Sequence, residues 1–140
     1  MNAGRSVKLV IVPLGFVLVA GLGIAVGQQT APTTDKGRTA KTVASLDLGL
    51  QIEGLQGRYL RMRVITYEPG GHGALHSHKD RPVILYILHG TLTDCRAVGD
   101  CKELHEGQTK AEEGKEVTHW VENKSTKPGT LIAVDISKER

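Results

Sequence analysis

The stretch YEPGGHGALHSHKDRPVILYILHG, Tyr67 to Gly90, holds four of the six histidines in this 140-residue chain. Two of them, His76 and His78, are separated by one residue and follow a glycine-rich turn. Alternate side chains on a β-strand point to the same face, so both imidazoles can bind one ion. The spacing therefore predicts a metal site built on a strand.

A third ligand must come from another strand, and His119 in EVTHWVEN is the best candidate. Three neutral imidazoles leave open coordination positions on Fe, Mn, Zn, Ni or Cu, which is typical of catalytic rather than closed structural sites. Two simpler interpretations stay open. The His76/His78 pair can be a polar strand edge, or the imidazoles can serve only as hydrogen-bonding groups.

The remaining sequence is typical of an all-β protein. In RYLRMRVITYEP, Leu60, Met62 and Val64 fall on one face and Tyr59, Arg61 and Arg63 fall on the other, the period-two pattern of a half-buried strand. Further short strands are predicted in VILYILHGTLTDC, VTHWVEN and GTLIAVDIS. Several such strands, with turn residues between them, favour a sandwich or barrel. Trp120 follows His119 and is expected to point away from it, onto the outer sheet.

The first motif resembles that of the cupins, which are small antiparallel β-barrels of the jelly-roll class. Their pattern is Gly, five residues, His-x-His, three or four residues, Glu, six residues, Gly. Here Gly70, His76, His78 and Gly90 fit, and Val83 stands at the glutamate position. The second motif matches less closely. Gly107, Gly114, His119 and Asn123 follow it, but its proline is absent and Gly107 to His119 is one residue too long.

This resemblance implies a single jelly-roll cupin barrel with His76, His78 and His119 as metal ligands. Val83 replaces the carboxylate ligand and cannot bind a metal. Asp80 is a weaker substitute, because it lies on the turn side of the motif. The candidates for the substrate pocket are His72, Val83 and Tyr67; Tyr67, Tyr86 and His72 are the candidates for a general base.

The N-terminus has the pattern of a targeting segment. Two positive charges precede eighteen uncharged residues, 9–26, which predict a hydrophobic helix. We assign residues 1–27 to a signal peptide or membrane anchor, 28–43 to a flexible linker, and 44–140 to the cupin domain. Either assignment predicts export to the periplasm or the extracellular space, and an uncleaved segment would anchor the protein in the inner membrane through residues 9–26.

Cys95 and Cys101 flank RAVGD, whose Gly99-Asp100 suits a hairpin turn. In an exported chain such a pair predicts a disulfide, with two free thiols as the alternative. The net charge is +3, and two of the basic residues lie in the leader. The other Lys and Arg are scattered, so we expect no nucleic-acid partner.

Two functions fit these observations. The first is a small exported metalloenzyme, most simply a dioxygenase, with a lyase or isomerase as further options, that holds a small molecule at a divalent metal. The second is a module that binds a metal or small ligand without catalysis. The sequence does not identify the substrate, and it is compatible with a homodimer.

Overall fold

The computed structural model describes residues 30–114 and 117–138, and this part of the chain is all-β, as predicted. Its strands are β1 (Lys36–Asp47), β2 (Tyr59–His72), β3 (His76–Ser77), β4 (Val83–His89), β5 (Thr91–Ala97), β6 (Asp100–His105), β7 (Thr109–Glu112), β8 (Thr118–Glu122) and β9 (Gly129–Ser137). A single 3-10 turn, η1 (Leu48–Leu50), follows β1. Within residues 30–114 and 117–138, no helix has the length and hydrophobicity of a membrane span. The predicted helix over residues 9–26 lies outside the described residues.

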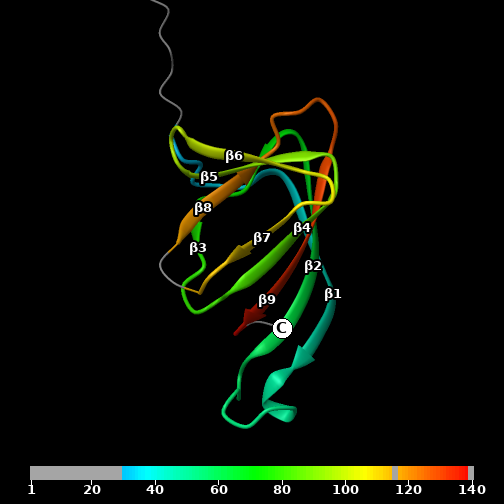
Figure 1. Cartoon of the computed structure of the whole chain (residues 1–140), viewed down its shortest axis with the longest axis vertical. Helices are drawn as coiled ribbons and strands as arrows, with labels where there is room; N and C mark the ends of the chain where they lie inside the picture. The colour runs from blue at the N-terminus through cyan, green and yellow to red at the C-terminus, as the bar shows by residue number, and fades with distance from the viewer. Residues whose placement is uncertain (1–29, 115–116, 139–140) are drawn as a thin grey trace, which may run out of the picture.

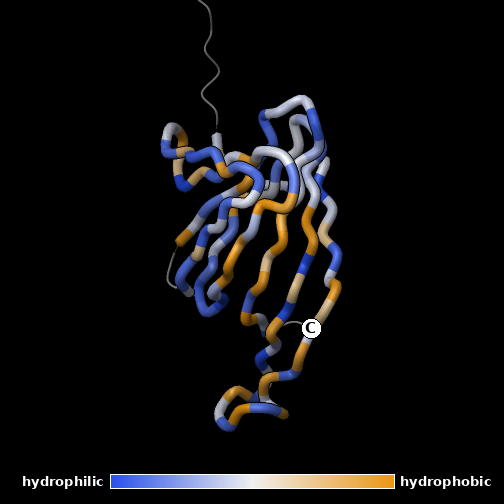
Figure 2. The backbone as a smooth tube through the Cα atoms, turned by 45° about the vertical axis from the view of Figure 1, so that its right-hand side comes forward, coloured by the Kyte–Doolittle hydropathy of each residue, from blue (hydrophilic) through white to orange (hydrophobic). Residues whose placement is uncertain are grey.

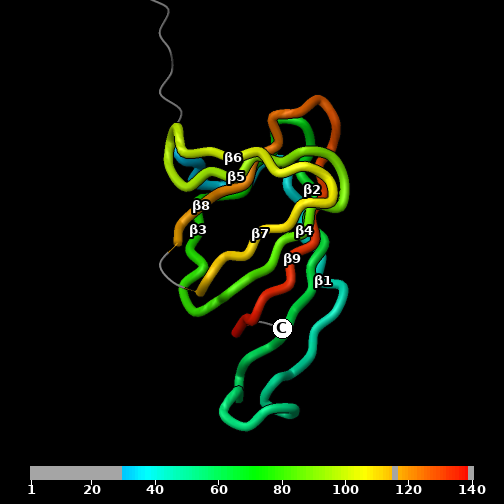
Figure 3. The backbone as a smooth tube through the Cα atoms, in the orientation of Figure 1, coloured from blue at the N-terminus to red at the C-terminus, as the bar shows by residue number. Residues whose placement is uncertain are grey.

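The strands form two antiparallel layers, which together make a nearly closed barrel (Figure 1). One layer has the order β1-β2-β9-β4-β7, and the other has the order β3-β8-β5-β6. They join where His72, at the end of β2, pairs with Glu122 of β8. The connection from β1 to β2 extends beyond the rest of the barrel (Figure 3). Because β3 pairs with β8, two segments far apart in sequence lie side by side.

The core lies between the two layers and consists of side chains that point into the barrel. Hydrophobic and hydrophilic residues alternate along several strands, as a sheet with two different faces requires (Figure 2). The buried cluster comprises Ile65, Tyr67, Val83, Leu85, Ile87, Leu92, Leu104, Val121, Leu131 and Ala133. It fills the barrel beside the histidines, so the site has an apolar wall.

Strand β2 alternates as predicted, but its apolar row faces outward. A half-buried strand is expected to turn its apolar residues inward, yet Leu60 is 39% exposed and Arg61 is 6% exposed. The reason lies further along the strand, where Ile65 and Tyr67 enter the core and share the face of Arg61. Asp135 is the register partner of Arg61 on β9 and accepts a hydrogen bond from its guanidinium. This ion pair offsets the cost of burying the arginine's charge.

The predicted linker over residues 28–43 is wrong for residues 36–43. These belong to β1, which pairs along its length with β2. The segment has no apolar periodicity because most of its side chains stay exposed. Its order comes from backbone hydrogen bonds to β2, which need no apolar stripe. Residues 30–35 precede the strand, and the structure describes nothing before them.

Candidate metal centre

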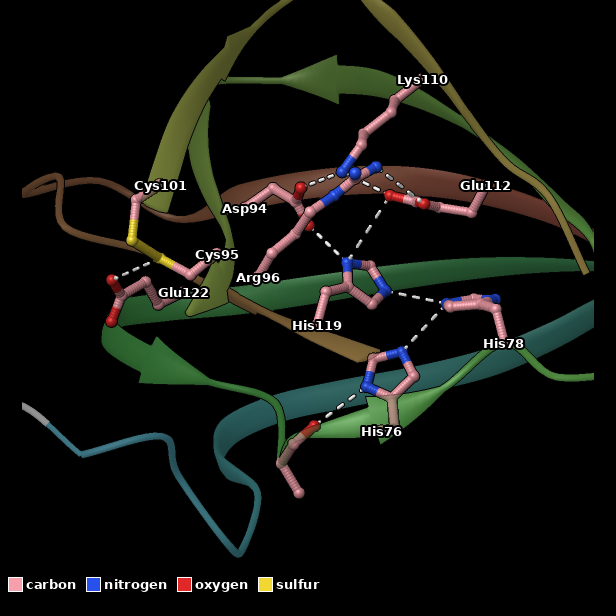
Figure 4. Close-up of polar contacts among 11 residues, drawn as sticks. His76, His78, Asp94, Cys95, Arg96, Cys101, Lys110, Glu112, His119 and Glu122 are labelled. Atoms are coloured by element: carbon pink, nitrogen blue, oxygen red, sulfur yellow. Dashed lines mark hydrogen bonds and ion pairs between the residues drawn. A yellow bond between two sulfur atoms is a disulfide. The ribbon is translucent and has the colours of Figure 1, made fainter. Parts of the chain in front are cut away.

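Three histidines from separate parts of the sequence meet at one end of the barrel cavity (Figure 4). His76 lies on β3 and His119 on β8, and these two residues are register partners. His78 follows β3, and its backbone N–H donates to the carbonyl of Val117 at 3.0 Å. The one-residue spacing and the β3–β8 pairing together bring three imidazoles to one point.

The three Nε2 atoms converge. The Nε2 atoms of His76 and His78 are 3.2 Å apart, and those of His78 and His119 are 2.8 Å apart. Metal–nitrogen bonds of about 2.0–2.1 Å place ligand nitrogens roughly 3.3 Å apart in a tetrahedral site. The spacing therefore fits one ion, with small adjustments of the rings.

Each Nδ1 atom is already engaged with an acceptor. Nδ1 of His76 donates to the carbonyl of Ala74 at 2.9 Å, and Nδ1 of His78 donates to the carbonyl of Arg81 at 3.2 Å. Nδ1 of His119 donates to the carboxylate of Asp94. Carbonyls and carboxylates only accept, so each neutral ring carries its proton on Nδ1 and turns an Nε2 lone pair toward the centre. This donor set suits a divalent metal.

Burial keeps two of these rings neutral. It lowers the pKa of His76 and that of His78 from 6.5 to about 4, and the neighbouring His119 and Arg81 act in the same direction. Hydrogen bonds to the backbone carbonyls oppose the shift without cancelling it. At neutral pH both imidazoles are therefore unprotonated, which is the form that binds a metal.

Behind His119 lies a buried charged cluster that sequence reasoning did not identify. It comprises Asp94 on β5 together with Lys110 and Glu112 on β7 (Figure 4). Lys110 bridges the two carboxylates, and Asp94 accepts from His119. Burial alone would raise the pKa of Asp94, but its hydrogen bonds to His119 and Lys110 lower it overall. Asp94 is therefore a charged acceptor that orients the third imidazole.

The cavity beside the histidines has a volume of about 210 Å³. Its apolar wall is formed by Ile65, Val83, Leu85, Val121, Leu131 and Ala133. Its polar groups, apart from the histidines, are Asp35, Arg38, Arg63, Tyr67 and Arg81. Val83 is 3% exposed and is the register partner of Glu112. The residue at the glutamate position thus lines the cavity. Its register partners on the two flanking strands both carry a carboxylate, Glu112 on β7 and Asp135 on β9.

Tyr67 lines the same cavity and contacts Arg38 from β1. The Arg38 Nε donates to the phenolic oxygen at 3.4 Å. Burial raises the pKa of Tyr67, and Arg38 opposes that rise. Asp35 accepts from Arg38 at 2.7 Å and from the backbone N–H of Ala74 at 2.7 Å, which ties β1 to the segment before His76. The supposed linker therefore contributes part of the site.

His72 was predicted for the pocket, Tyr86 as a candidate base and Asp80 as a substitute ligand, and all three lie elsewhere. His72 does not line the cavity, because it sits between two buried glycines, Gly71 and Gly73, and alternation turns its side chain the other way. Tyr86 is 41% exposed on the outer face of β4. Asp80 lies in the turn after β3 and does not reach the histidine cavity. Trp120 does not line that cavity either, and it is buried.

His89 and His105 are exposed and do not belong to the group of three histidines. The residues missed were Asp94, Lys110 and Glu112, together with the arginines of the cavity wall. For Asp94 the sequence offers one indication. It lies two residues after the apolar Leu92, so on a strand both side chains point to the same, inward face. This alternation alone does not identify the residue that Asp94 contacts on a neighbouring strand.

Cys95 and Cys101 form a disulfide, as expected from their spacing. They are register partners across the β5–β6 hairpin. Cys95 is completely buried, whereas Cys101 is exposed. The bridge closes the hairpin one residue beyond Asp94, so it supports the strand that carries the partner of His119.

Comparisons with known proteins agree with this architecture. A family model described as "Cupin domain" matches residues 63–135, which is more than half of the chain. No curated protein matches the sequence. Three solved structures illustrate the shared fold.

A predicted oxalate decarboxylase from Thermotoga maritima is 18% identical with a TM-score of 0.57, and the match covers 77% of this chain and 90% of that one. The polyketide cyclase RemF from Streptomyces resistomycificus is 16% identical with a TM-score of 0.58, covering 76% and 68%. A sugar phosphate isomerase of the cupin superfamily from Silicibacter pomeroyi is 19% identical with a TM-score of 0.55, covering 72% of this chain and 60% of that one. The chain thus spans less than two thirds of that isomerase. At these identities the likeness concerns the fold alone.

Proposed function

This chain belongs to the cupin family, and from that premise we propose that it binds a divalent metal through His76, His78 and His119 and acts on a small molecule in the adjoining cavity. The observation that carries the proposal is the engagement of all three Nδ1 atoms, which leaves three Nε2 lone pairs directed at one point. Without an ion or a proton between them, these lone pairs would repel one another.

A bound metal would supply Lewis-acid or redox chemistry at its open coordination positions. Fe, Mn, Zn, Ni and Cu all accept imidazole ligands. The chain's own residues define the surroundings. The apolar wall that includes Val83 and Val121 excludes water from one side, while Arg38 and Tyr67 provide hydrogen-bond donors for an oxygen-bearing ligand.

Acid–base groups near the histidines are few. Asp35 is the one carboxylate among the described residues that line the cavity, and it is engaged with Arg38 and Ala74. Its pKa is lowered, because these contacts outweigh the effect of burial, so it is a weak base. This favours a reaction in which the metal activates the substrate or O2, and we propose a small-molecule dioxygenase ahead of a lyase or isomerase.

The same observation favours a second candidate, a binding module without catalysis. A site that lacks both a free general base and the fourth family ligand can capture a metal or small ligand and do no chemistry. Metal analysis and O2 uptake on the full chain, with phenols, flavonols, diketones and thiols as substrates, separate the two. Bound metal with turnover supports the enzyme, and bound metal without turnover supports the module.

Alanine variants test the metal site that both functions share. Metal content of the purified chain should fall sharply in His76→Ala, His78→Ala and His119→Ala, with the β-sheet circular dichroism unchanged. His105→Ala is the matched control, since that imidazole is exposed and remote from the other three. Wild-type metal content in His119→Ala would show that the second motif has been misassigned.

We also propose that the protein is exported to the periplasm or extracellular space, with residues 9–26 as a signal or an inner-membrane anchor. The uncharged segment and the Cys95–Cys101 bridge support this location. Fractionation of cells that express the tagged chain tests it, and recovery in the cytoplasm would contradict it. A homodimer remains a prediction, for which light scattering is the measurement.

A further inference from the structure

A second cavity, of about 410 Å³, lies beside the histidine cavity and is lined almost entirely by cationic residues. It is formed by the beginning of β2, the end of β9 and the turn between β3 and β4. Arg63 and Arg81 line both cavities, so their side chains form the shared wall. We call this second cavity the basic cavity.

The lining of the basic cavity carries far more positive than negative charge. Its cations are Arg58, Arg61, Arg63, Lys79, Arg81 and Lys138. Its one acidic residue among those described is Asp80, and its remaining residue is Ser137. Like charges gathered around a concave surface raise the local concentration of anions.

Three of these arginines are held by one buried carboxylate. Arg61 makes two hydrogen bonds to Asp135, both at 3.1 Å. Arg63 donates to the same carboxylate at 2.8 Å, and Arg81 donates to it at 3.0 Å. The Asp135 side chain has no exposed surface. Three guanidinium groups therefore share this one carboxylate.

Arg63 keeps one donor that this carboxylate does not satisfy. Its Nε is buried and has no hydrogen-bond partner in the described part of the chain. Burial lowers the pKa of Arg63; Asp135 opposes this shift, while Arg61, Arg81 and Arg38 add to it. A buried donor without a partner costs free energy, which an anionic ligand would offset.

The turn that covers the basic cavity is held in place. Arg58 donates to the carbonyl of Asp80 at 2.9 Å, and Arg81 donates to the carbonyl of Ser77 at 3.4 Å. The carbonyl of Arg81 in turn accepts from Nδ1 of His78. The cations are therefore arranged before any ligand arrives, and the same turn orients a histidine of the metal centre.

We propose that the basic cavity binds a phosphate group, either free or carried by a small organic molecule. Each guanidinium has five N–H donors, and the two oxygens of Asp135 engage only some of those on Arg61, Arg63 and Arg81. A phosphate has more acceptor oxygens and more charge than a carboxylate, which suits the unsatisfied Nε of Arg63 and the cations Arg58, Arg81 and Lys138 of the same cavity. The site does not depend on the histidine metal, so it can be tested without one.

Calorimetric titration of the full chain in EDTA, with inorganic phosphate and with glycerol 3-phosphate, measures this binding. We expect both to bind, and to bind more weakly as salt is raised. Tighter binding of the ester identifies a phosphorylated molecule as the ligand, and equal binding identifies free phosphate. If neither probe binds the wild-type chain, the proposal is overturned.

The double variant Lys79→Gln/Lys138→Gln removes two exposed cations from the rim and leaves the Asp135 cluster intact. Phosphate affinity should fall about tenfold. Lys41→Gln/Lys102→Gln is the matched control, because it removes the same charge from exposed positions outside the basic cavity. An equal loss in both double variants would show general attraction to a cationic protein rather than a site.

Discussion

His119 and Asp94 form a buried pair in which Nδ1 of the imidazole donates to the carboxylate. The two residues lie on the adjacent strands β8 and β5, at 1% and 4% exposure. Lys110 contacts the other oxygen of Asp94 and holds the carboxylate in its charged form. The orientation of His119, one of the three proposed metal ligands, therefore depends on a strand that carries none of the histidines.

Asp94→Asn should weaken metal binding while leaving all three histidines in place. The amide is neutral and accepts more weakly, so it no longer fixes the His119 tautomer. Loss of such a partner typically costs about 10–100-fold in metal affinity. Competition with a chelator of known affinity measures the change. Glu103→Gln, on the exposed strand β6, is the control. Equal affinities for Asp94→Asn and wild type would show that Asp94 does not act through His119.

Val83→Glu should restore a carboxylate at the cavity wall and make stability dependent on metal. Burying the glutamate in the metal-free protein should lower the free energy of unfolding by about 1–3 kcal/mol. The carboxyl group loses its hydrogen bonds to water and gains no partner in the apolar wall. Hard divalent ions such as Mn should recover that loss, since an ion that binds only the folded state stabilises it. Thermal unfolding with and without Mn measures both effects.

Ile84→Glu is the matched control for that experiment. Ile84 is the next residue on β4, is 59% exposed and faces away from the cavity. A glutamate there should cost little, and Mn should not change its melting temperature. If Val83→Glu is destabilised equally with and without Mn, position 83 does not face the ion.

Stability of the metal-free protein should fall between pH 6.5 and about 4. The pKa of His76 and that of His78 are lowered from 6.5 to about 4 in the folded state. Between these values the unfolded chain binds more protons, so acid favours unfolding; above pH 6.5 the contribution of these groups is fully present. Urea unfolding in EDTA at several pH values measures the slope.

The double variant His76→Asn/His78→Asn should flatten that slope. The control is the double variant His89→Ala/His105→Ala, which removes two exposed histidines. It should keep the wild-type slope of unfolding free energy against pH. Asp94 and Asp135 do not confuse the comparison. Their lowered pKa values make the associated loss of stability begin only as pH approaches 3.8, at the acid end of the window, and both carboxylates are present in every variant compared. A wild-type slope in the asparagine variant would refute the assignment to these two rings.

Removing the disulfide should destabilise the protein by about 2 kcal/mol, because the bridge closes a short loop and restricts the unfolded chain. Cys95→Ala/Cys101→Ala tests this, since alanine leaves no polar group at the buried position 95. Denaturant unfolding of the variant and of the oxidised wild type gives the difference. Equal stability under oxidising conditions would mean that the hairpin gains nothing from the bridge.

Local patterns were sufficient for the features that depend on neighbouring residues. Strand periodicity predicted the all-β class, and the His76/His78 spacing placed two imidazoles on one face. The short interval between Cys95 and Cys101 predicted a hairpin bridge. Each of these follows from geometry within a few residues, where the backbone itself sets the distance between side chains.

Long-range pairing decided the rest. Alternation shows which residues of β2 share a face, but only the packing of Ile65 and Tyr67 determined that Arg61 and Arg63 turn inward. The strand register brought Asp135 to these arginines and Asp94 to His119. No local pattern encodes such contacts, because they join residues many positions apart, and their charges are stable inside the barrel only when the whole sheet has formed.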